Sequence, residues 1–401
     1  MTIKKWRSTV NSTTNKIWTK DFILICIANF FTFSAFQMTL PTLPLFIQEL
    51  GGTDEIIGMI VSIFTVSALL IRPFTGQGLE FIGRRKVYLT GVILFALSLS
   101  LLSIVHSILF LFIIRIIQGF GWGMTTTSAG TVATDIIPEH RRGEGMGYYG
   151  LSVNIALAFG PSLGLLLVDF ISFMELFLIT AGLVFTAFII GLFIQYKPIE
   201  LTETSVRHFQ LDFFEKNALP PASLLFFITV TFGGITSYLP LYTKDLGFAS
   251  YHIQLYFMIY AIALLVTRLY SGRLYDQYGL KPVFVPGTLL IIIAMLLLAW
   301  LPSPIVLYIA AALYGTGFGS VQPALQAWAV NSASKTRKGM ANATFFSAFD
   351  LGVGIGALSF GFIAHMTGYS TIYIVAALSV LTSLCLYLFV IRTHQSNSVS
   401  K

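Results

Sequence analysis

The chain of 401 residues is poor in charge and in cysteine. Asp, Glu, Lys and Arg together make up 10% of it, whereas a soluble domain carries roughly 25%. Because so few charges cannot cover a surface that faces water, we expect most of the surface to face lipid. The two cysteines, Cys26 and Cys385, fall inside predicted helices. We expect free thiols packed as small apolar residues, and no metal site.

Motifs for catalysis and nucleotide binding are also missing. The sequence has no G-x-x-x-x-G-K-[ST] loop, which argues against ATP-driven transport. The six histidines are scattered without the spacing of metal ligands. No cleavable signal peptide is visible, because the first apolar stretch is too long and follows a polar tail of about 20 residues. We therefore expect neither an enzyme nor a bound cofactor.

Long apolar runs recur along the chain, and hydrophobic residues make up 56% of it. A helix needs roughly 17–25 apolar residues to cross a bilayer. In lipid the backbone must satisfy its own hydrogen bonds, which favours helices over strands here. We expect twelve spans, near 22–47, 54–74, 86–105, 108–130, 145–168, 172–195, 219–243, 252–272, 283–301, 304–328, 341–365 and 370–391.

The second half of the chain repeats the first at an offset of 196 residues, without a gap. Arg72 returns as Arg268, for example, and Gly51 as Gly247. The period is far longer than the roughly 20–50 residues of solenoids. Two similar bundles in one apolar chain are typical of transporters that rock two halves about a central site. Further pairs in the same register are Gly76 with Gly272, Gly83 with Gly279, Gly119 with Gly315, Gly121 with Gly317, Gly123 with Gly319, and Gly160 with Gly356.

This repeat predicts an all-α membrane protein with twelve transmembrane helices in two pseudo-symmetric six-helix bundles. The longest polar segment lies between the two copies of the repeat and is expected to connect them. We expect a cytoplasmic N-terminal tail over 1–20, the first bundle over 21–195, a cytoplasmic linker over 196–218, the second bundle over 219–392 and a cytoplasmic tail over 393–401.

The formal net charge is +7, and its distribution predicts the topology. With the N-terminus inside, the connections expected outside carry several acids but one cation, Lys244. Nearly all other Lys and Arg fall on the expected inner side, which places both termini in the cytoplasm. The basic excess therefore indicates topology and no nucleic-acid partner. We expect a multi-pass monomer of the cell membrane, embedded in the lipid bilayer.

A charged turn between the second and third spans is the strongest local motif. It reads GQGLEFIGRRK over 76–86, and GRLYDQYGLK follows over 272–281. Both copies resemble the signature loop G-x-L-a-D-r-x-G-r-[KR] of the major facilitator superfamily, although the first departs at Gly78 and Glu80. In that family the loop latches the cytoplasmic ends of the halves. The alternative is a charge cluster that only sets topology. The implied latch residues are Gly76, Glu80 facing the N-terminus of the eleventh span, Gly83, Arg84 paired with Asp135, Gly272, Asp276 and Gly279.

Arg115 is the basic residue that we place deep inside a span. A cation there is costly unless it is paired or hydrated, so it is a candidate functional residue. With Gln118 and Gly119 it resembles the R-x-x-Q-G pattern of motif B, whose arginine lies in the central cavity and is linked to proton movement. The alternative is a structural arginine bonded to backbone carbonyls near a kink. The second half has Ala311 here, so any role is one-sided.

The fifth span carries Asn154, Gly160, Pro161 and Gly164. Gly-Pro interrupts the helical hydrogen bonds and lets helices approach closely. The segment resembles motif C, the antiporter motif g-x-x-x-G-P-x-x-G-G, and departs from it at the first and last glycines. The resemblance implies export. A packing kink without directional meaning is the alternative.

Asp350 is the acidic residue that we place deep in a span, in register with Asn154. Burial favours the neutral form of a carboxyl group, so Asp350 could bind and release a proton near neutral pH. Related antiporters often keep an acid in the first helix, where this chain offers Asn29 and Gln37. We therefore expect Asp350 to carry the proton, coupled with Arg115. An interhelical hydrogen bond to Ser or Asn is the alternative.

Aromatic residues are abundant, with 36 Phe, 17 Tyr and 5 Trp. Several lie in spans that line the cavity in the resembling family. We expect some of them to form an apolar pocket with few polar groups, suited to amphipathic molecules. The expected polar substrate contacts are Gln37, Gln118, Trp122, Tyr238, Tyr314 and Gln322.

The motifs and the repeat together predict a proton-coupled multidrug efflux transporter of the drug:proton antiporter branch. It would export small amphipathic molecules, drugs or metabolites, by alternating access. An external proton would neutralise Asp350, or perturb its link to Arg115, and favour the inward return. A proton symporter for uptake, a lipid flippase and a non-transporting membrane receptor stay open. So does an anionic substrate, because no acid in its own half matches Arg115.

Overall fold

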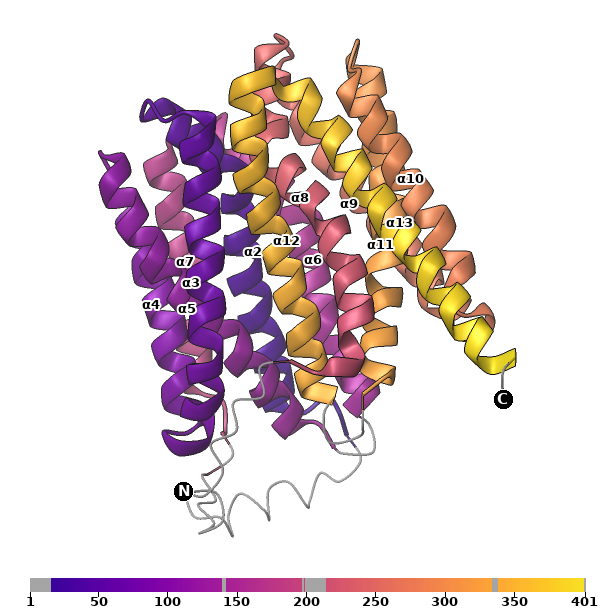
Figure 1. Cartoon of the computed structure of the whole chain (residues 1–401). Coiled ribbons are helices and arrows are strands. Elements are labelled where there is room, and N and C mark those ends of the chain that lie inside the picture. The colour runs from indigo at the N-terminus through magenta and orange to yellow at the C-terminus, as the bar shows by residue number, and fades with distance from the viewer. Residues whose placement is uncertain (1–15, 139–141, 197, 199–213, 334–337, 400–401) are drawn as a thin grey trace. The chain divides into compact units, whose positions relative to one another are not determined.

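The structure is a computed structural model that describes residues 16–138, 142–196, 198, 214–333 and 338–399. Within these ranges the chain forms helices and turns but no strand. A short 3-10 helix, η3 (Lys216–Ala218), precedes the second group of long helices. The long helices are α2 (Lys20–Glu49), α3 (Asp54–Phe81), α4 (Arg84–Leu102), α5 (Ile108–Ile136), α6 (Arg142–Val168), α7 (Phe173–Leu192), α8 (Leu219–Asp245), α9 (Ser250–Tyr278), α10 (Lys281–Ala299), α11 (Pro304–Asn331), α12 (Lys338–Thr367) and α13 (Tyr369–Val399) (Figure 1).

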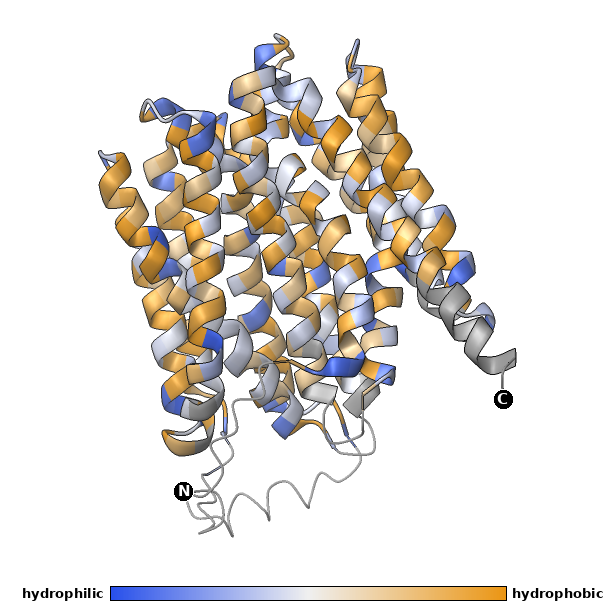
Figure 2. Ribbon diagram, viewed as in Figure 1, coloured by the Kyte–Doolittle hydropathy of each residue, from blue (hydrophilic) through white to orange (hydrophobic). Residues whose placement is uncertain are grey.

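Twelve helices in the described ranges are long and apolar enough to cross a membrane, which confirms the predicted number of spans. Apolar residues predominate along most of the length of these helices (Figure 2). Several helices extend beyond the apolar runs, as α5 does past residue 130, because their last turns carry polar residues. The predicted N-terminal tail and the predicted linker lie largely outside the described residues. The predicted bundle boundaries stay a prediction.

Contacts divide the chain into two compact units. The first contains 1–42 and 63–212, and the second contains 43–62 and 213–401. In the first unit, α4 packs against α5 and α7. In the second, α8 packs against α12 and α13, and α11 packs against α9 and α10. The turn between α2 and α3 thus belongs to the second unit, although its sequence is part of the first repeat.

Close helix contacts at glycine recur in both units at the same positions of the repeat. A Cβ atom on Gly121 would lie 2.6 Å from the backbone nitrogen of Phe95, and one on Gly317 would lie 3.2 Å from that of Ile291. Both the glycines and their neighbours are 196 residues apart. The duplication in the sequence is therefore also a duplication of packing. Two further correspondences are Gly119 on Phe64 with Gly315 on Tyr260, and Gly123 on Ala68 with Gly319 on Leu264.

Both cysteines are free, as predicted. Cys26 is half-buried in α2, but Cys385 is exposed on α13. The prediction of a packed thiol is therefore wrong for Cys385. The outward face of an apolar helix accepts a thiol because it behaves as a small hydrophobic group.

Candidate transport site

The first polar group of the site is the guanidinium of Arg115 in α5, which is 2% exposed. Its Nη1 donates a hydrogen bond to Oε1 of Gln118 at 2.6 Å, because residues three apart share one face of a helix. Its Cζ lies 4.2 Å from the ring centre of Phe64 in α3, a distance typical of a cation over an aromatic face. A buried positive charge is thus held by a neutral amide and an aromatic ring.

Aromatic rings from several helices of the first unit pack around Trp122, one turn beyond Gln118. Phe36 of α2 stacks on Trp122 with ring centres 4.0 Å apart. Phe33, Phe64 and Phe95 also contact this indole ring. Trp122 is 4% exposed, so these rings form a packed apolar cluster, and Phe64 joins it to the Arg115 group.

Two buried amide side chains of the first unit each have a polar atom without a hydrogen-bond partner among the described residues. Both Gln37 and Gln118 are buried. Oε1 of Gln37 and Nε2 of Gln118 have no hydrogen-bond partner among the residues that the structure describes. Such a group is costly to bury unless a bound molecule or water completes it. The two amides therefore offer one acceptor and one donor to a ligand.

The Gly-Pro segment of α6 brings this helix against α2 at very short distance. A Cβ atom on Gly160 would lie 2.5 Å from the Cβ of Gln37. One on Gly164 would lie 2.9 Å from both the Cα and the carbonyl carbon of Met38. Pro161 lies inside the helix between these two contacts. Asn154, one to two turns earlier, is half-buried.

A hydrogen-bond chain between α2 and α6 was not expected from the sequence. Nδ2 of Asn29 donates to Oγ of Ser152 at 2.8 Å, and the hydroxyl of Tyr149 donates to Oδ1 of Asn29 at 2.9 Å. Asn29 is 2% exposed. A polar residue in the first span was the available signal, but its partners lie more than 100 positions away.

The charged turn after α3 brings Arg84 and Asp135 together. Nε of Arg84 lies 3.0 Å from Oδ2 of Asp135, and Nη1 donates to the carbonyl of Leu79 at 2.9 Å. Gly83 has φ 103° and Gly279, its counterpart, has φ 77°, which favours glycine in both turns. The ion pair is present, while the predicted latch stays a prediction. The side chains of Glu80 and Asp276 and the surroundings of Gly272 lie outside the described residues. A Cβ on Gly76 would meet nothing within 4 Å.

The second unit holds the remaining predicted residues. Asp350 is half-buried in α12, next to Phe349, whose ring contacts Phe232 and Phe318. The hydroxyl of Tyr314 lies 2.9 Å from Oγ1 of Thr231, and this side chain is fully buried. These groups link α8, α11 and α12.

Tyr238 and Gln322 bind protein groups within the second unit. The Tyr238 hydroxyl donates to the backbone carbonyl of Ala357 at 2.7 Å. Oε1 of Gln322 accepts from Nη2 of Arg268 at 2.6 Å. Arg268 was missed as a candidate, although its register with Arg72 was visible in the sequence. The second unit thus has its own glutamine-bound guanidinium.

Twelve long apolar helices and a duplicated packing pattern indicate a multi-pass membrane protein. A family model described as Major Facilitator Superfamily matches residues 25–253 and 222–401. The chain therefore belongs to the major facilitator superfamily.

Relatives and solved structures agree with this assignment. The chain is 27% identical to the staphylopine export protein of Staphylococcus aureus (strain Mu50), over 90% of this chain and 93% of that one. It is 23% identical to the quinolone resistance protein NorA of Staphylococcus aureus, over 90% and 94%.

Two solved structures share the fold. A D-xylose–proton symporter has a TM-score of 0.73 at 16% identity, covering 91% of this chain and 96% of that one. The human organic anion transporter MFSD10 has a TM-score of 0.69 at 19% identity, covering 91% and 98%. The chain is thus similar to transporters over nearly its whole length.

Proposed function

We propose that this transporter is a monomeric, proton-coupled exporter of small amphipathic molecules that works by alternating access. The observation that carries the proposal is the Arg115 guanidinium, which is 2% exposed and is held by Gln118 and Phe64. A charge so costly to bury is retained where it moves an ion or binds a substrate. Two similar proteins are named as an export protein and as a resistance protein, which favours export over uptake.

The aromatic cluster around Trp122 and the two buried amides of the first unit suit an amphipathic substrate. The rings around Trp122 supply apolar surface, and the buried amides of Gln37 and Gln118 supply an acceptor and a donor. A pocket with a few polar groups in an aromatic lining binds molecules with an apolar body and a small polar group. The substrate would thus complete hydrogen bonds that the described residues leave unmade.

Proton coupling is assigned to Asp350 in α12, together with Arg115. A carboxyl group inside the membrane region is costly when charged, so binding of a proton changes which conformation is preferred. Substrate and proton drive the cycle in opposite directions only if each binds the two conformations with different affinity. The Arg84–Asp135 pair would then stabilise one of these conformations at the cytoplasmic surface.

Inside-out membrane vesicles test the direction and the coupling. A growth screen of an overexpressing strain against diverse toxic compounds first supplies a substrate. Acidifying the vesicle lumen should then drive accumulation of this compound, and collapsing the pH gradient should release it. A symporter would instead lose the compound from an acidic lumen. A flippase or receptor would show no accumulation that follows the gradient.

A further inference from the structure

The segment 43–62, which joins α2 to α3, is bound to α8 and α12 within the second unit. Oγ of Ser62 donates to the backbone carbonyl of Gly354 at 2.7 Å. The hydroxyl oxygen of Tyr238, which donates to Ala357, also lies 3.2 Å from the backbone carbonyl oxygen of Asp54. The beginning of α3 is therefore held at both ends of its first two turns.

Glycines on both sides make this contact tight. A Cβ atom on Gly58 of α3 would lie 2.6 Å from the carbonyl oxygen of Ala357. One on Gly361 of α12 would lie 2.7 Å from the Tyr238 hydroxyl and would also meet the Asp54 carbonyl. Backbone thus lies on backbone over at least one turn of each helix, which is the geometry of a specific contact between membrane helices.

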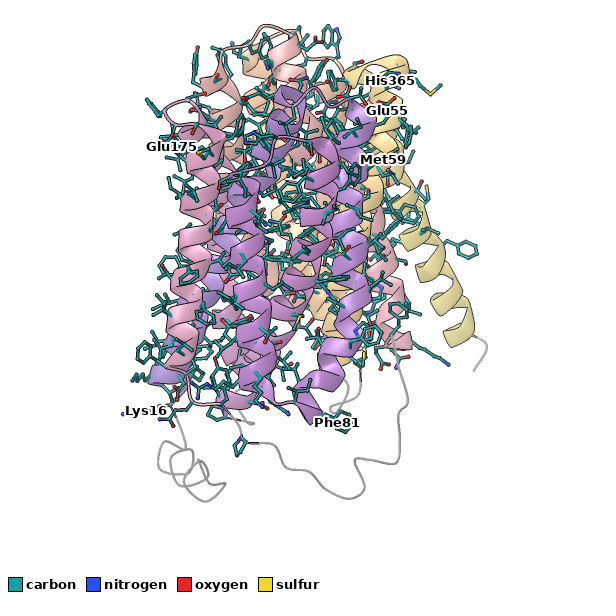
Figure 3. The ribbon with its side chains drawn as sticks, turned by 90° about the vertical axis from the view of Figure 1, so that its left-hand side faces the viewer. Lys16, Glu55, Met59, Phe81, Glu175 and His365 are labelled. Carbon is teal, nitrogen blue, oxygen red and sulfur yellow. The ribbon has the colours of Figure 1, made fainter. Side chains whose placement is uncertain are left out.

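A polar cluster closes the contact at the first turn of α3. Oδ1 of Asp54 accepts a hydrogen bond from the Tyr369 hydroxyl at 3.0 Å. Nδ1 of His365 lies 3.2 Å from Oε1 of Glu55, and Figure 3 shows these two side chains side by side. The side chain of His365 is 60% exposed and that of Glu55 is 19% exposed. The histidine is therefore open to protons from the solution.

The charged and titratable groups around this histidine come from three helices. Asp54 and Glu55 begin α3, and both interact electrostatically within the cluster. Asp245 at the end of α8 and Tyr369 at the start of α13 also act on Asp54. Lys244 donates to Oε1 of Gln48 at 3.4 Å. Apart from this lysine, the charged groups around the histidine are acidic. The residues named in this cluster are Gln48, Asp54, Glu55, Lys244, Asp245, His365 and Tyr369.

We propose that the contact of 43–62 with α12 is an external gate that external protons close through the His365–Glu55 pair. Residues after Ser62 in α3 belong to the first unit, so the contact ties the two repeats at one end of α3. The other end of α3 leads into the cytoplasmic turn at Gly83. The assignment of this gate to the external side rests on the proposed function and on the topology predicted from the charge distribution, with both termini in the cytoplasm.

The His365–Glu55 pair determines whether acid strengthens or weakens the closed contact. A histidine gains its proton as the external pH falls from 7.5 to 5.5, and its bond to Glu55 then becomes charge-assisted. The closed contact is therefore stronger at acidic external pH. Because the histidine is well exposed, the gain is small, and we expect roughly a two- to fivefold shift of the opening equilibrium.

Cysteine accessibility measures this opening without substrate or flux. The parent carries Cys26→Ala, Cys385→Ala and Ala357→Cys, so that its single thiol lies under the gate, where Ala357 is fully buried. An impermeant maleimide is added to intact cells at external pH 7.5 or 5.5, and the labelling rate is recorded. The readout is the rate for a His365→Gln variant divided by the parent rate at the same pH. This ratio cancels the pH dependence of the thiol reaction itself.

The ratio should be close to one at pH 7.5 and about two to five at pH 5.5. Glu55→Gln should behave in the same way, and His365→Arg should label slowly at both pH values. The matched control is His252→Gln in α9, because Nδ1 of His252 lies 2.6 Å from the Tyr308 hydroxyl instead of a carboxylate. Its ratio should stay near one.

An equal ratio for His365→Gln at both pH values overturns the proposal, and so does a thiol that is labelled only after the membrane is permeabilised. This assay follows opening of the contact and needs neither a substrate nor transport. Proton-independent transport in vesicles, together with pH-dependent labelling, would therefore refute the proposed function and leave the gate intact.

Discussion

Gly164→Ala tests whether the approach of α6 to α2 is as tight as the structure shows. The new methyl group would lie 2.9 Å from two backbone carbons of Met38, whereas nonbonded carbons pack at roughly 3.5–4.0 Å. Backbone atoms cannot rotate away, so the helices must separate by roughly half an ångström or more. Overpacking of this kind costs about 1–3 kcal/mol, and the better helix propensity of alanine returns at most about 1 kcal/mol.

Gly150→Ala is the matched control, because it lies in the same helix and its Cβ would meet nothing within 4 Å. It gains the helix propensity without the clash. The apparent melting temperature of the detergent-solubilised protein, followed by size-exclusion chromatography after heating, compares the two variants. With roughly 2–4 °C for each kcal/mol and an overpacking cost of at least about 1 kcal/mol, Gly164→Ala should melt at least about 2 °C below Gly150→Ala. Equal melting temperatures would refute the close approach.

Three other substitutions test separate contacts. Arg115→Gln removes a charge-assisted hydrogen bond of about 1.5–3 kcal/mol to Gln118. Substrate transport by this variant should therefore fall roughly tenfold or more at unchanged expression. Transport at the wild-type rate in the variant would exclude a role for the charge. Arg84→Asp should lower transport, and adding Asp135→Arg should restore part of it; no recovery in the double variant would show that the pair acts otherwise. Ser172→Ala removes the capping box at the start of α7 and should cost about 0.5–2 kcal/mol of stability, measured as a lower melting temperature; an unchanged value would contradict the cap.

The sequence predicted the number and kind of the elements because lipid imposes one solution on long apolar runs. The register of the repeat, which the sequence shows directly, is also found in the packing. Glycines such as Gly121 and Gly317 repeat in register, and the structure places both against the backbone of a neighbouring helix. The pairing of Arg84 with Asp135 came from the resemblance to a known loop, since the two residues are 51 positions apart.

Other contacts could not be read from the pattern, because hydrogen-bond partners depend on how helices rotate and meet. Asn29 was visible as a polar residue in the first span, but its bonds to Ser152 and Tyr149 were not. Hydropathy and repeat register place the segment 43–62 with the first half. In the structure, its side-chain bonds to α8 and α12 place this segment in the second unit instead. The sequence likewise gives no sign that His365 faces Glu55.

Substrate-linked proton movement in proteoliposomes tests the central claim, coupled export, most directly. Purified protein is reconstituted with a pH-sensitive dye in the lumen, and an identified substrate is added outside. The account predicts that protons leave the lumen as substrate enters through the parent protein. Asp350→Asn should abolish this proton movement, while Asp350→Glu should retain part of it. Proton movement that is unchanged in Asp350→Asn, or absent from the parent during transport, would contradict the account.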